Sequence, residues 1–234
     1  MKHEIKLQRD YYTRKASQYE QMHVQGDGEH DLACMLVAGL ASHYNLLTIL
    51  DVGSGTGRAV IRLSKHFHRA DVLGIEPVEA LRAIGHSNGI PKDKLIDGDA
   101  TKIAFNNQSF DLVMELGMLH HVPYPHLVIA EMLRVSRRAI FISDINRFGR
   151  GGWLSKQTKL SLWRIGLWPL FNWLKTKGKR YHFGEGDGVA YSYSVFDDYT
   201  YIKNQCSQVI IFNLDGSGMN ALTGAHHIGL FAIK

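Results

Sequence analysis

Residues 49–59, ILDVGSGTGRA, decide the fold of this chain. An apolar strand runs into Asp51, glycines follow at positions 53, 55 and 57, and a helical pattern begins at Arg58. Glycine allows a sharp backbone turn and lets a ligand approach the main chain without a Cβ in the way. The N-terminus of the following helix adds oriented amide groups. The stretch therefore predicts a ligand-binding turn between a buried strand and a helix.

The same glycines could belong to a dinucleotide-binding turn, GxGxxG, which an acidic residue follows about 20 residues later. Gly53 and Gly55 are in register with that pattern, but Arg58 stands where the third glycine should be. That glycine allows the helix to pack closely against the strand. The arginine argues against NAD binding, and an NAD-dependent oxidoreductase stays open only as an alternative.

Strand and helix patterns alternate on both sides of this turn. Strands are predicted at 46–52, 70–76, 94–99, 109–115 and 138–145, and helices at 58–67, 78–86 and 125–135. Such alternation predicts right-handed parallel crossovers and an α/β fold with a doubly wound, Rossmann-like sheet. The last two strands, at 208–214 and 226–234, suit an antiparallel hairpin, which completes a seven-stranded sheet. Residues 1–45 are predicted to form an N-terminal helical cap, and residues 46–234 the main domain with a helical lid inserted at about 147–195.

Composition is that of an ordinary globular domain. Of 234 residues, 45% are apolar and 21% are charged, which excludes a disordered tail, a collagen-like fibre and a disulfide-stapled miniprotein. Cys34 and Cys206 are far apart in the sequence and are expected to be reduced. The first twelve residues, MKHEIKLQRDYY, carry charges from the start and contain no apolar segment, and the chain has no run of about 18 apolar residues. We therefore expect no signal peptide, no spanning helix and a cytoplasmic location.

Further acidic residues stand at or just after the ends of the next three predicted strands. Glu76 ends the second strand, Asp99 follows the third, and Glu115 and Leu116 end the fourth. Together with D-x-G-x-G-x-G at 51–57, they resemble the class I S-adenosylmethionine (SAM) dependent methyltransferases, in particular the small-molecule group. The resemblance implies that residues 46–234 are a SAM-binding methyltransferase domain. It implies that cofactor-binding residues are Tyr19, Asp51, Gly53, Ser54, Gly55, Glu76, Pro77, Asp99, Ala100, Glu115 and Leu116.

Individual roles follow from the same resemblance. Glu76 would hold both ribose hydroxyls, since one carboxylate can accept two hydrogen bonds from a cis diol. Asp99 would accept from the adenine amino group, and the Ala100 amide would meet the ring. Residues 12–20, YTRKASQYE, are similar to the segment that precedes the fold in many of these enzymes, where the second tyrosine, here Tyr19, closes over the cofactor. The alternative is an amphipathic helix with surface tyrosines.

Three residues are candidates for the chemistry of transfer. A base within hydrogen-bond reach can assist an oxygen or nitrogen acceptor, and in doubly wound sheets the chemistry lies beyond the carboxyl ends of the strands. His120 and His121 follow the fourth strand, and Asp144 ends the fifth. The alternative roles are packing for one histidine, solvation for the other, and capping of a turn for Asp144. Catechol-type relatives bind a metal through an Asp-Asn pair after strand five. Ile145 interrupts that pair here, so no catalytic metal is predicted.

The insertion at 150–180 holds all four tryptophans of the chain and eight basic residues without an acid. Three interpretations remain open. The segment could be a lid whose tryptophans pack on the sheet or line a pocket, or a surface that contacts an anionic membrane. It could also bind an anionic substrate such as a nucleotide sugar or RNA, although no RNA-binding module is present, so no nucleic-acid partner is predicted. Residues 181–194 are predicted to be a polar, flexible loop beside it.

The sequence thus predicts a cytoplasmic, metal-independent SAM methyltransferase that acts on a small molecule, by preference at oxygen. A sugar, a lipid-linked precursor or a secondary metabolite is the expected acceptor. Two alternatives stay open besides the NAD enzyme: an N-methyltransferase, and a SAM-fold protein that binds the cofactor without transferring methyl. The oligomeric state is left open.

Overall fold

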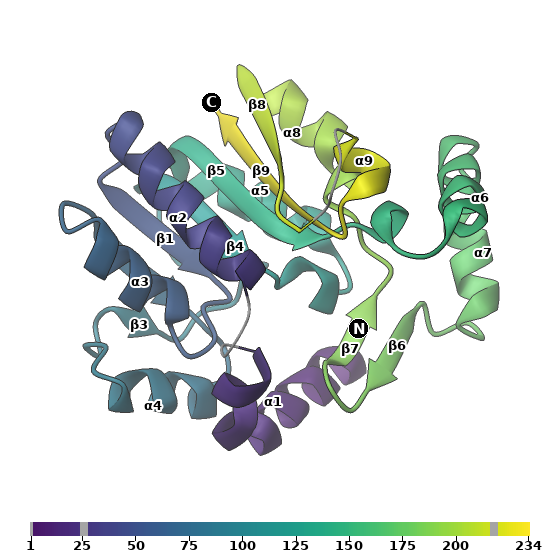
Figure 1. The fold of residues 1–234 in the computed structure, drawn as a ribbon. Coiled ribbons are helices and arrows are strands. Elements are labelled where there is room, and N and C mark those ends of the chain that lie inside the picture. Colours follow the sequence, from purple (N-terminus) through teal and green to yellow (C-terminus); the bar gives the residue numbers. More distant parts are fainter. Residues whose placement is uncertain (1, 24–27, 216–219) are drawn as a thin grey trace.

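A computed structural model describes residues 2–23, 28–215 and 220–234, and within these ranges seven strands form one sheet in the order β3-β2-β1-β4-β5-β9-β8 (Figure 1). Strands β1 to β5 are parallel, whereas β9 runs antiparallel to both β5 and β8. The predicted doubly wound α/β sheet with a C-terminal antiparallel hairpin is confirmed. The strands are β1 Thr48–Val52, β2 Asp71–Ile75, β3 Leu95–Ile96, β4 Phe110–Leu116, β5 Ser136–Ile145, β8 Gln208–Asn213 and β9 His227–Ile233.

Helices cover both faces of the sheet (Figure 1). Val37 and Leu63 pack on one face, and Ile129 and Ile202 on the other. Because both faces are buried, the strands carry continuous apolar runs rather than alternating ones, as in β4, where the consecutive Leu112, Val113 and Met114 are all buried. The helices concerned are α2 Gly28–His43 and α3 Arg58–His66 on the first face, and α5 Pro125–Val135 and α8 Tyr199–Gln205 on the second.

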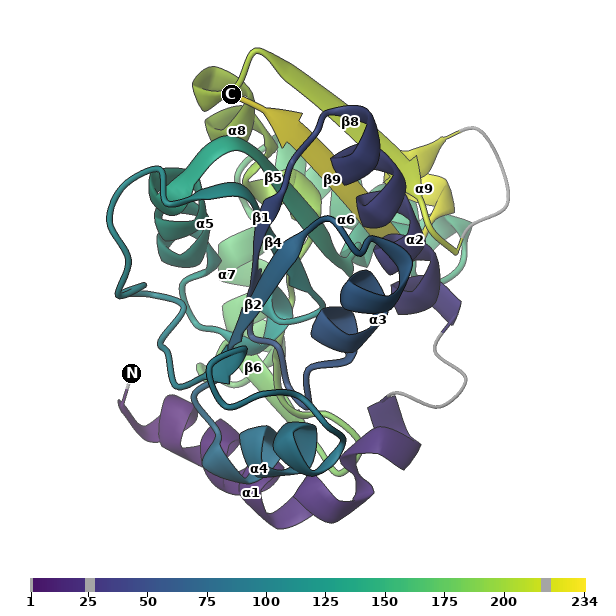
Figure 2. The same ribbon diagram turned by 90° about the vertical axis from the view of Figure 1, so that its left-hand side faces the viewer.

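The N-terminal helix α1 (Lys2–His23) lies beyond the carboxyl ends of the parallel strands, beside α4 (Glu79–Ser87) (Figures 1 and 2). Ala16 of α1 packs with Val78 and Leu81 at the start of α4. The region predicted as one cap therefore has two parts, since α2 packs on the sheet while α1 covers the strand ends. Residues 1 and 24–27 of that region lie outside the described residues, as do residues 216–219 between β8 and the short helix α9 (Ala221–Gly224).

The insertion after β5 forms two helices and a hairpin. Helices α6 (Trp153–Arg164) and α7 (Trp168–Lys175) stand at one edge of the molecule (Figure 1). Strands β6 (Tyr181–Gly184) and β7 (Gly188–Tyr191) then pair antiparallel, where the sequence predicted a flexible loop.

Contacts with α1 explain why this hairpin forms. The Val189 N–H donates to Oε1 of Gln8 at 2.5 Å, and the Tyr11 hydroxyl donates to the carbonyl of Glu185 at 2.7 Å. These partners are more than 170 residues apart in the sequence. Local sequence therefore carries little of the information that orders the hairpin.

Candidate active site

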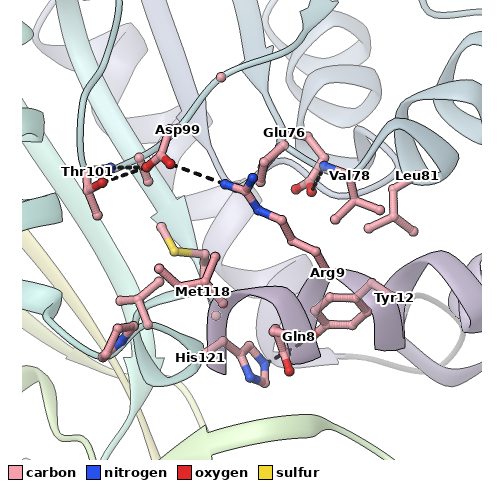
Figure 3. A pocket seen from close by; sticks show the side chains of 18 of the residues that line it. Gln8, Arg9, Tyr12, Glu76, Val78, Leu81, Asp99, Thr101, Met118 and His121 are labelled. Atoms are coloured by element: carbon pink, nitrogen blue, oxygen red, sulfur yellow. Dashed lines mark hydrogen bonds and ion pairs between the residues drawn. The ribbon is translucent and has the colours of Figure 1, made fainter. Parts of the chain in front are cut away.

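A cavity of about 260 Å³ lies between α1 and the carboxyl ends of the parallel strands (Figure 3). Its walls include Gly53 of the glycine turn, Glu76 after β2, Asp99 after β3, and His121. A second, smaller and more polar pocket of about 30 Å³ adjoins it. Tyr19, Gly53 and Leu116 line both spaces, so a single ligand can extend from one into the other.

The glycine turn has the backbone that its sequence predicts. Gly53 and Gly55 both have φ in the left-handed region, at +73° and +58°. A Cβ at Gly55 would lie 2.6 Å from the hydroxyl oxygen of Tyr19, and one at Gly53 would lie 2.6 Å from Cγ of Met118. The amides of Gly53 and Ser54 donate to the carbonyl of Ile75 at 2.9 and 3.0 Å, which ties the turn to β2. Glycine is therefore needed here both for backbone conformation and for space.

Glu76 presents a buried carboxylate to the cavity. Its Oε2 accepts from the Gly55 N–H at 3.0 Å, and its Oε1 accepts from the Val78 N–H at 2.9 Å. Burial raises the pKa of Glu76 to about 7. Each carboxylate oxygen has a further lone pair, so the group can accept two more hydrogen bonds from a ligand.

Asp99 shares its carboxylate between its own turn and helix α1. Its Oδ1 accepts from the amide and the hydroxyl of Thr101 at 2.9 and 2.7 Å, and its Oδ2 accepts from Nη2 of Arg9 at 3.2 Å. Burial opposes ionisation, but these bonds lower the pKa of Asp99 below its ordinary value. Figure 3 shows the Arg9 side chain reaching from α1 toward Asp99, past Glu76. A ligand that bonds to Oδ2 of Asp99 therefore competes with Arg9. Pro77 and Ala100 also line this part of the cavity.

Asp51 and Ser54 belong to the smaller pocket, together with Arg58. The Ser54 hydroxyl donates to Oδ2 of Asp51 at 2.5 Å. Burial raises the pKa of Asp51 to about 6, although the Ser54 bond opposes this shift. A carboxylate and a guanidinium in one small space suit a zwitterionic group such as an amino acid.

Glu115 and Leu116 differ in their positions. Leu116 lines both cavities, whereas the fully buried Glu115 carboxylate lies behind the wall. Its two oxygens accept from the amides of Met118 and Ser143 at 2.9 and 3.1 Å. Burial, reinforced by Asp144, raises the pKa of Glu115 well above its ordinary value. Glu115 thus supports the turn after β4 rather than facing the cavity.

His120 and His121 lie in a 3₁₀ turn, η1 (Leu119–His121), directly after β4. His121 lines the cavity, its Nδ1 lies 2.7 Å from the carbonyl oxygen of Val189, and its Nε2 lies 3.1 Å from the Tyr12 hydroxyl. His120 is buried, with its Nδ1 2.8 Å from Oδ1 of Asp144. Asp144 is itself fully buried, and its Oδ2 accepts from the Leu119 N–H at 2.8 Å. Asp144 therefore orients His120 and does not line the cavity.

Asp187, in the turn of the β6–β7 hairpin, completes this cluster, and sequence reasoning did not find it. Its Oδ1 lies 3.3 Å from Nε2 of His121, and its Oδ2 lies 3.6 Å from Nε2 of His120. Burial lowers the pKa of His120, but the neighbouring Asp144 and Asp187 outweigh burial and raise that pKa to about 10. Burial raises the pKa of Asp187, but the two histidines outweigh it and lower that pKa. The sequence signal was only an acidic residue between two glycines.

Helices α6 and α7 do not contribute to the larger cavity, whose described lining residues all lie outside 150–180. Trp163 packs against Phe148 with ring centroids 5.3 Å apart, and Trp168 is buried. Trp153 and Trp173 are exposed. In this arrangement the β6–β7 hairpin, rather than the helices, reaches the site.

Fold and site together define a class of protein. A parallel sheet with the order β3-β2-β1-β4-β5, an antiparallel β9 inserted beside β5, a glycine turn after β1 and an acid after β2 are the features of class I SAM-dependent methyltransferases.

Comparisons with known proteins agree with this class. Residues 50–141 match the family described as methyltransferase domain. The chain is 32% identical over 117 residues to phosphatidylethanolamine N-methyltransferase of Cereibacter sphaeroides, covering 47% of this chain and 56% of that protein. It is 35% identical over 105 residues to a ubiquinone biosynthesis O-methyltransferase of Hahella chejuensis, covering 42% and 43%. The matched segments thus span about half the length of these relatives.

A solved structure extends the likeness of fold to nearly the whole chain. Magnesium protoporphyrin IX methyltransferase from Synechocystis, with bound SAM, superposes with a TM-score of 0.61 at 16% identity, covering 97% of this chain and 94% of that one. The chain thus has the fold of class I SAM-dependent methyltransferases, and its residues 50–141 match a methyltransferase domain. SAM is the cofactor of that class, which sets the NAD-dependent alternative aside.

Proposed function

We propose that this protein transfers the methyl group of SAM to a small-molecule acceptor. The supporting observation is the layout of one cavity, which has Glu76 and Asp99 among its walls and also reaches His121. The adenosyl part of the cofactor would lie against the two carboxylates, and the acceptor against His121. Bound SAM supplies a methyl group activated on a sulfonium sulfur, so the protein chiefly has to align the reactants and exclude water.

The residues present fit the cofactor. The free lone pairs of Glu76 suit the ribose diol, and Asp99 with the neighbouring Ala100 suits the edge of the adenine ring. Arg9 would turn outward from Asp99, as its half-exposed side chain permits. Asp51 and Arg58 would face the ammonium and carboxylate groups of the methionyl part, in the smaller pocket. Tyr19 would cover the junction between the two spaces.

Replacing Glu76 by glutamine or alanine should weaken SAM binding by roughly 1–3 kcal/mol, because hydrogen bonds to a charged group are lost. That loss corresponds to a dissociation constant about 5- to 150-fold higher. Isothermal titration calorimetry measures it directly, and Glu76→Gln keeps the shape of the buried side chain. Glu79→Ala, an exposed carboxylate three residues away, is the matched control. A dissociation constant that stays at the wild-type value in both Glu76 variants contradicts the ribose assignment.

His121 is suited to receive a proton from the acceptor. A carbonyl oxygen only accepts hydrogen bonds, so the contact with Val189 requires the proton of the neutral ring on Nδ1. The lone pair then lies on Nε2, on the side of Tyr12 and Asp187. As the bond between methyl carbon and acceptor oxygen forms and the bond to sulfur breaks, the hydroxyl proton would pass to Nε2. This requirement favours oxygen as the methylated atom, since a neutral amine can attack before it loses a proton.

An assay for release of S-adenosylhomocysteine, run with hydroxyl-bearing and amine-bearing acceptors, tests this function. Release that depends on a hydroxyl acceptor supports it. Tight SAM binding without release for any acceptor would favour the alternative of a cofactor-binding protein that does not transfer methyl.

A lipid-linked acceptor receives support from the surface of α6 and α7. Leu167, Leu170, Phe171 and Leu174 follow i, i+3, i+4 and i+7 spacing, which places them on one side of the helix, and all four are exposed. Trp153 and Leu154 at the start of α6 are more exposed still, at 72% and 73%. Basic residues of 150–180 accompany them without an acid. In the part of the chain that the structure describes, no helix is long and apolar enough to cross a bilayer.

We therefore propose that α6 and α7 rest on an anionic membrane, as basic helices with exposed aromatic and aliphatic side chains do. The two curated relatives are named for phosphatidylethanolamine and ubiquinone, both of which are lipids. An acceptor held in a membrane would then enter the cavity past exposed Tyr124 and Leu127, which line it.

The double variant Trp153→Ser/Leu154→Ser should bind vesicles rich in phosphatidylglycerol about tenfold less tightly than the wild type, because apolar area is lost from the contact. Cosedimentation with such vesicles measures the change, and phosphatidylcholine vesicles show how much depends on charge. Met35→Ser, on an exposed site of α2, is the matched control. Equal binding of the wild type and the double variant would contradict the membrane contact.

A further inference from the structure

Three atoms of a kind that binds metals converge at His121, which lines the cavity. They are Nε2 of His120, Nε2 of His121 and a carboxylate oxygen of Asp187, and a ligand atom of each residue lies within 4.8 Å of the others. Oδ1 of Asp187 lies 3.3 Å from Nε2 of His121, and Oδ2 lies 3.6 Å from Nε2 of His120.

The other nitrogen of each histidine is already committed. Nδ1 of His120 lies 2.8 Å from the Asp144 carboxylate, and Nδ1 of His121 lies 2.7 Å from the Val189 carbonyl. Histidines that bind metals usually donate their second ring N–H to a carboxylate or a backbone carbonyl, which sets the tautomer and the ring orientation. When the rings are neutral, both therefore direct an Nε2 lone pair toward the Asp187 carboxylate.

The spacing of these atoms suits a small transition-metal ion. Zinc binds imidazole nitrogen and carboxylate oxygen at about 2.0–2.2 Å, which puts the ligand atoms of a tetrahedral site about 3.4 Å apart. Each histidine Nε2 lies close to that distance from one oxygen of Asp187, His121 from Oδ1 and His120 from Oδ2. The charges also match, because Asp144 and Asp187 would bring two negative charges to a divalent ion.

We propose that His120, His121 and Asp187 form a binding site for one divalent transition-metal ion of the zinc kind. Two histidines and one carboxylate leave a position open, as in catalytic rather than structural zinc sites. His121 lines the cavity, and the Asp187 side chain is about half exposed at 48%, so both the ion and a ligand can reach the site. The open position would take water or an oxygen of the acceptor, and this last point rests on the proposed function. A bound ion uses the Nε2 lone pair of His121, so His121 would then be a metal ligand and not the base.

The site differs from the one that the sequence analysis considered. No metal is predicted from the sequence, because Ile145 separates Asp144 from Asn146. In the structure Asn146 caps the turn after β5, where its Oδ1 accepts from the Phe148 N–H at 3.1 Å. Asp144 serves the new site only by holding His120.

A proton on Nε2 of His120, directed toward Asp187, competes with a metal ion for this cluster. The Tyr12 hydroxyl is a second competitor, since it lies 3.1 Å from Nε2 of His121. A metal would take that lone pair from Tyr12, so Tyr12→Phe should keep metal binding intact whereas loss of a ligand should not.

Zinc titration of untagged protein, freed of metal by a chelator, tests the proposal. Calorimetry in the presence of a competing chelator should show one ion per chain, and cobalt substitution should give ligand-field absorption typical of nitrogen and oxygen ligands. His121→Ala and Asp187→Asn should bind at least tenfold more weakly, and Asp144→Asn about 10- to 100-fold more weakly through loss of the group that orients His120. Tyr12→Phe and the exposed-site variant His68→Ala should bind as the wild type does.

Wild-type protein that binds zinc no more tightly than Asp187→Asn would overturn the site, as would an equal loss in His68→Ala. SAM affinity of the metal-free protein and methyl transfer are measured separately. Absence of transfer with every acceptor, in the presence of normal zinc binding, would count against the proposed function and not against the metal site.

Discussion

Replacing His121 by alanine is expected to lower turnover at saturating SAM by about 10²- to 10⁴-fold, the range for loss of a positioned acid–base group. The side chain lines the cavity and holds its Nε2 within 3.3 Å of Asp187 and 3.1 Å of Tyr12. It is not one of the residues that surround Asp51 in the smaller pocket. SAM affinity should therefore change little, and the loss should fall on kcat. Steady-state kinetics with the acceptor found in the release assay, together with SAM titration, separate the two quantities.

His68→Ala is the control for this prediction, because it removes an exposed histidine outside the cavity. Equal losses of turnover and SAM affinity in His121→Ala would show a structural role, exerted through the hydrogen bond to Val189 of the hairpin. Asp187→Asn then distinguishes a base from a metal ligand. If His121 acts only as a base, Asp187→Asn should lower turnover modestly. If Asp187 holds a metal ion, Asp187→Asn should lower turnover as much as His121→Ala does.

The sheet could be predicted because its signals are local. Each parallel strand is a short apolar run between helical patterns, and both faces of the sheet are buried, so strand and helix periodicities do not conflict. Glu76 and Asp99 could be placed for a related reason. Glu76 directly follows β2 and Asp99 lies three residues after β3, and the ends of parallel strands meet at one edge of the sheet.

Direction of side chains was harder to predict. Glu115 and Leu116 were both assigned to the cofactor, yet neighbouring residues of a strand face opposite sides. The structure has Leu116 in the wall of the cavity and Glu115 bonded to the amides of Met118 and Ser143. Asp144 was proposed as a base, but the buried amides after β4 and the ring of His120 occupy its carboxylate.

Asp187 could not be predicted, because what places it is not encoded nearby. It is held beside the histidines by a hairpin that α1 anchors through Gln8 and Tyr11. Gly188, with φ +69°, leaves no room for a Cβ between these two side chains. A pattern in one segment does not reveal a contact that depends on three segments.

A second large effect, on the stability of the fold, is expected when Arg147 is replaced. It follows β5, and its guanidinium forms an ion pair with Asp197 and donates to the carbonyl of Ser192 at 3.1 Å. It also lies over the rings of Phe148 and Trp168, 4.6 and 5.2 Å from their centroids. The side chain is only 7% exposed. One residue therefore connects the sheet, the segment before α8 and the base of α7.

Arg147→Ala should reduce the free energy of unfolding by about 3 kcal/mol, the lower end of the range for removing one partner of a buried ion pair, because Asp197 keeps some contact with water. Urea denaturation followed by circular dichroism measures this change. Arg164→Ala, at an exposed site on α6, should stay within about 0.5 kcal/mol of the wild type.

A double-mutant cycle shows whether the ion pair is responsible for that loss. Asp197→Asn should cost less than Arg147→Ala, since it leaves a polar group that still accepts a hydrogen bond. The combined variant should cost less than the sum of the two single changes, because the second removes a partner that is already unpaired. Additive costs would mean that Arg147 acts through its stacking on Phe148 and Trp168 instead. In that case α7 should lose protection from hydrogen exchange before the sheet does, since Trp168 is the buried residue that seats this helix.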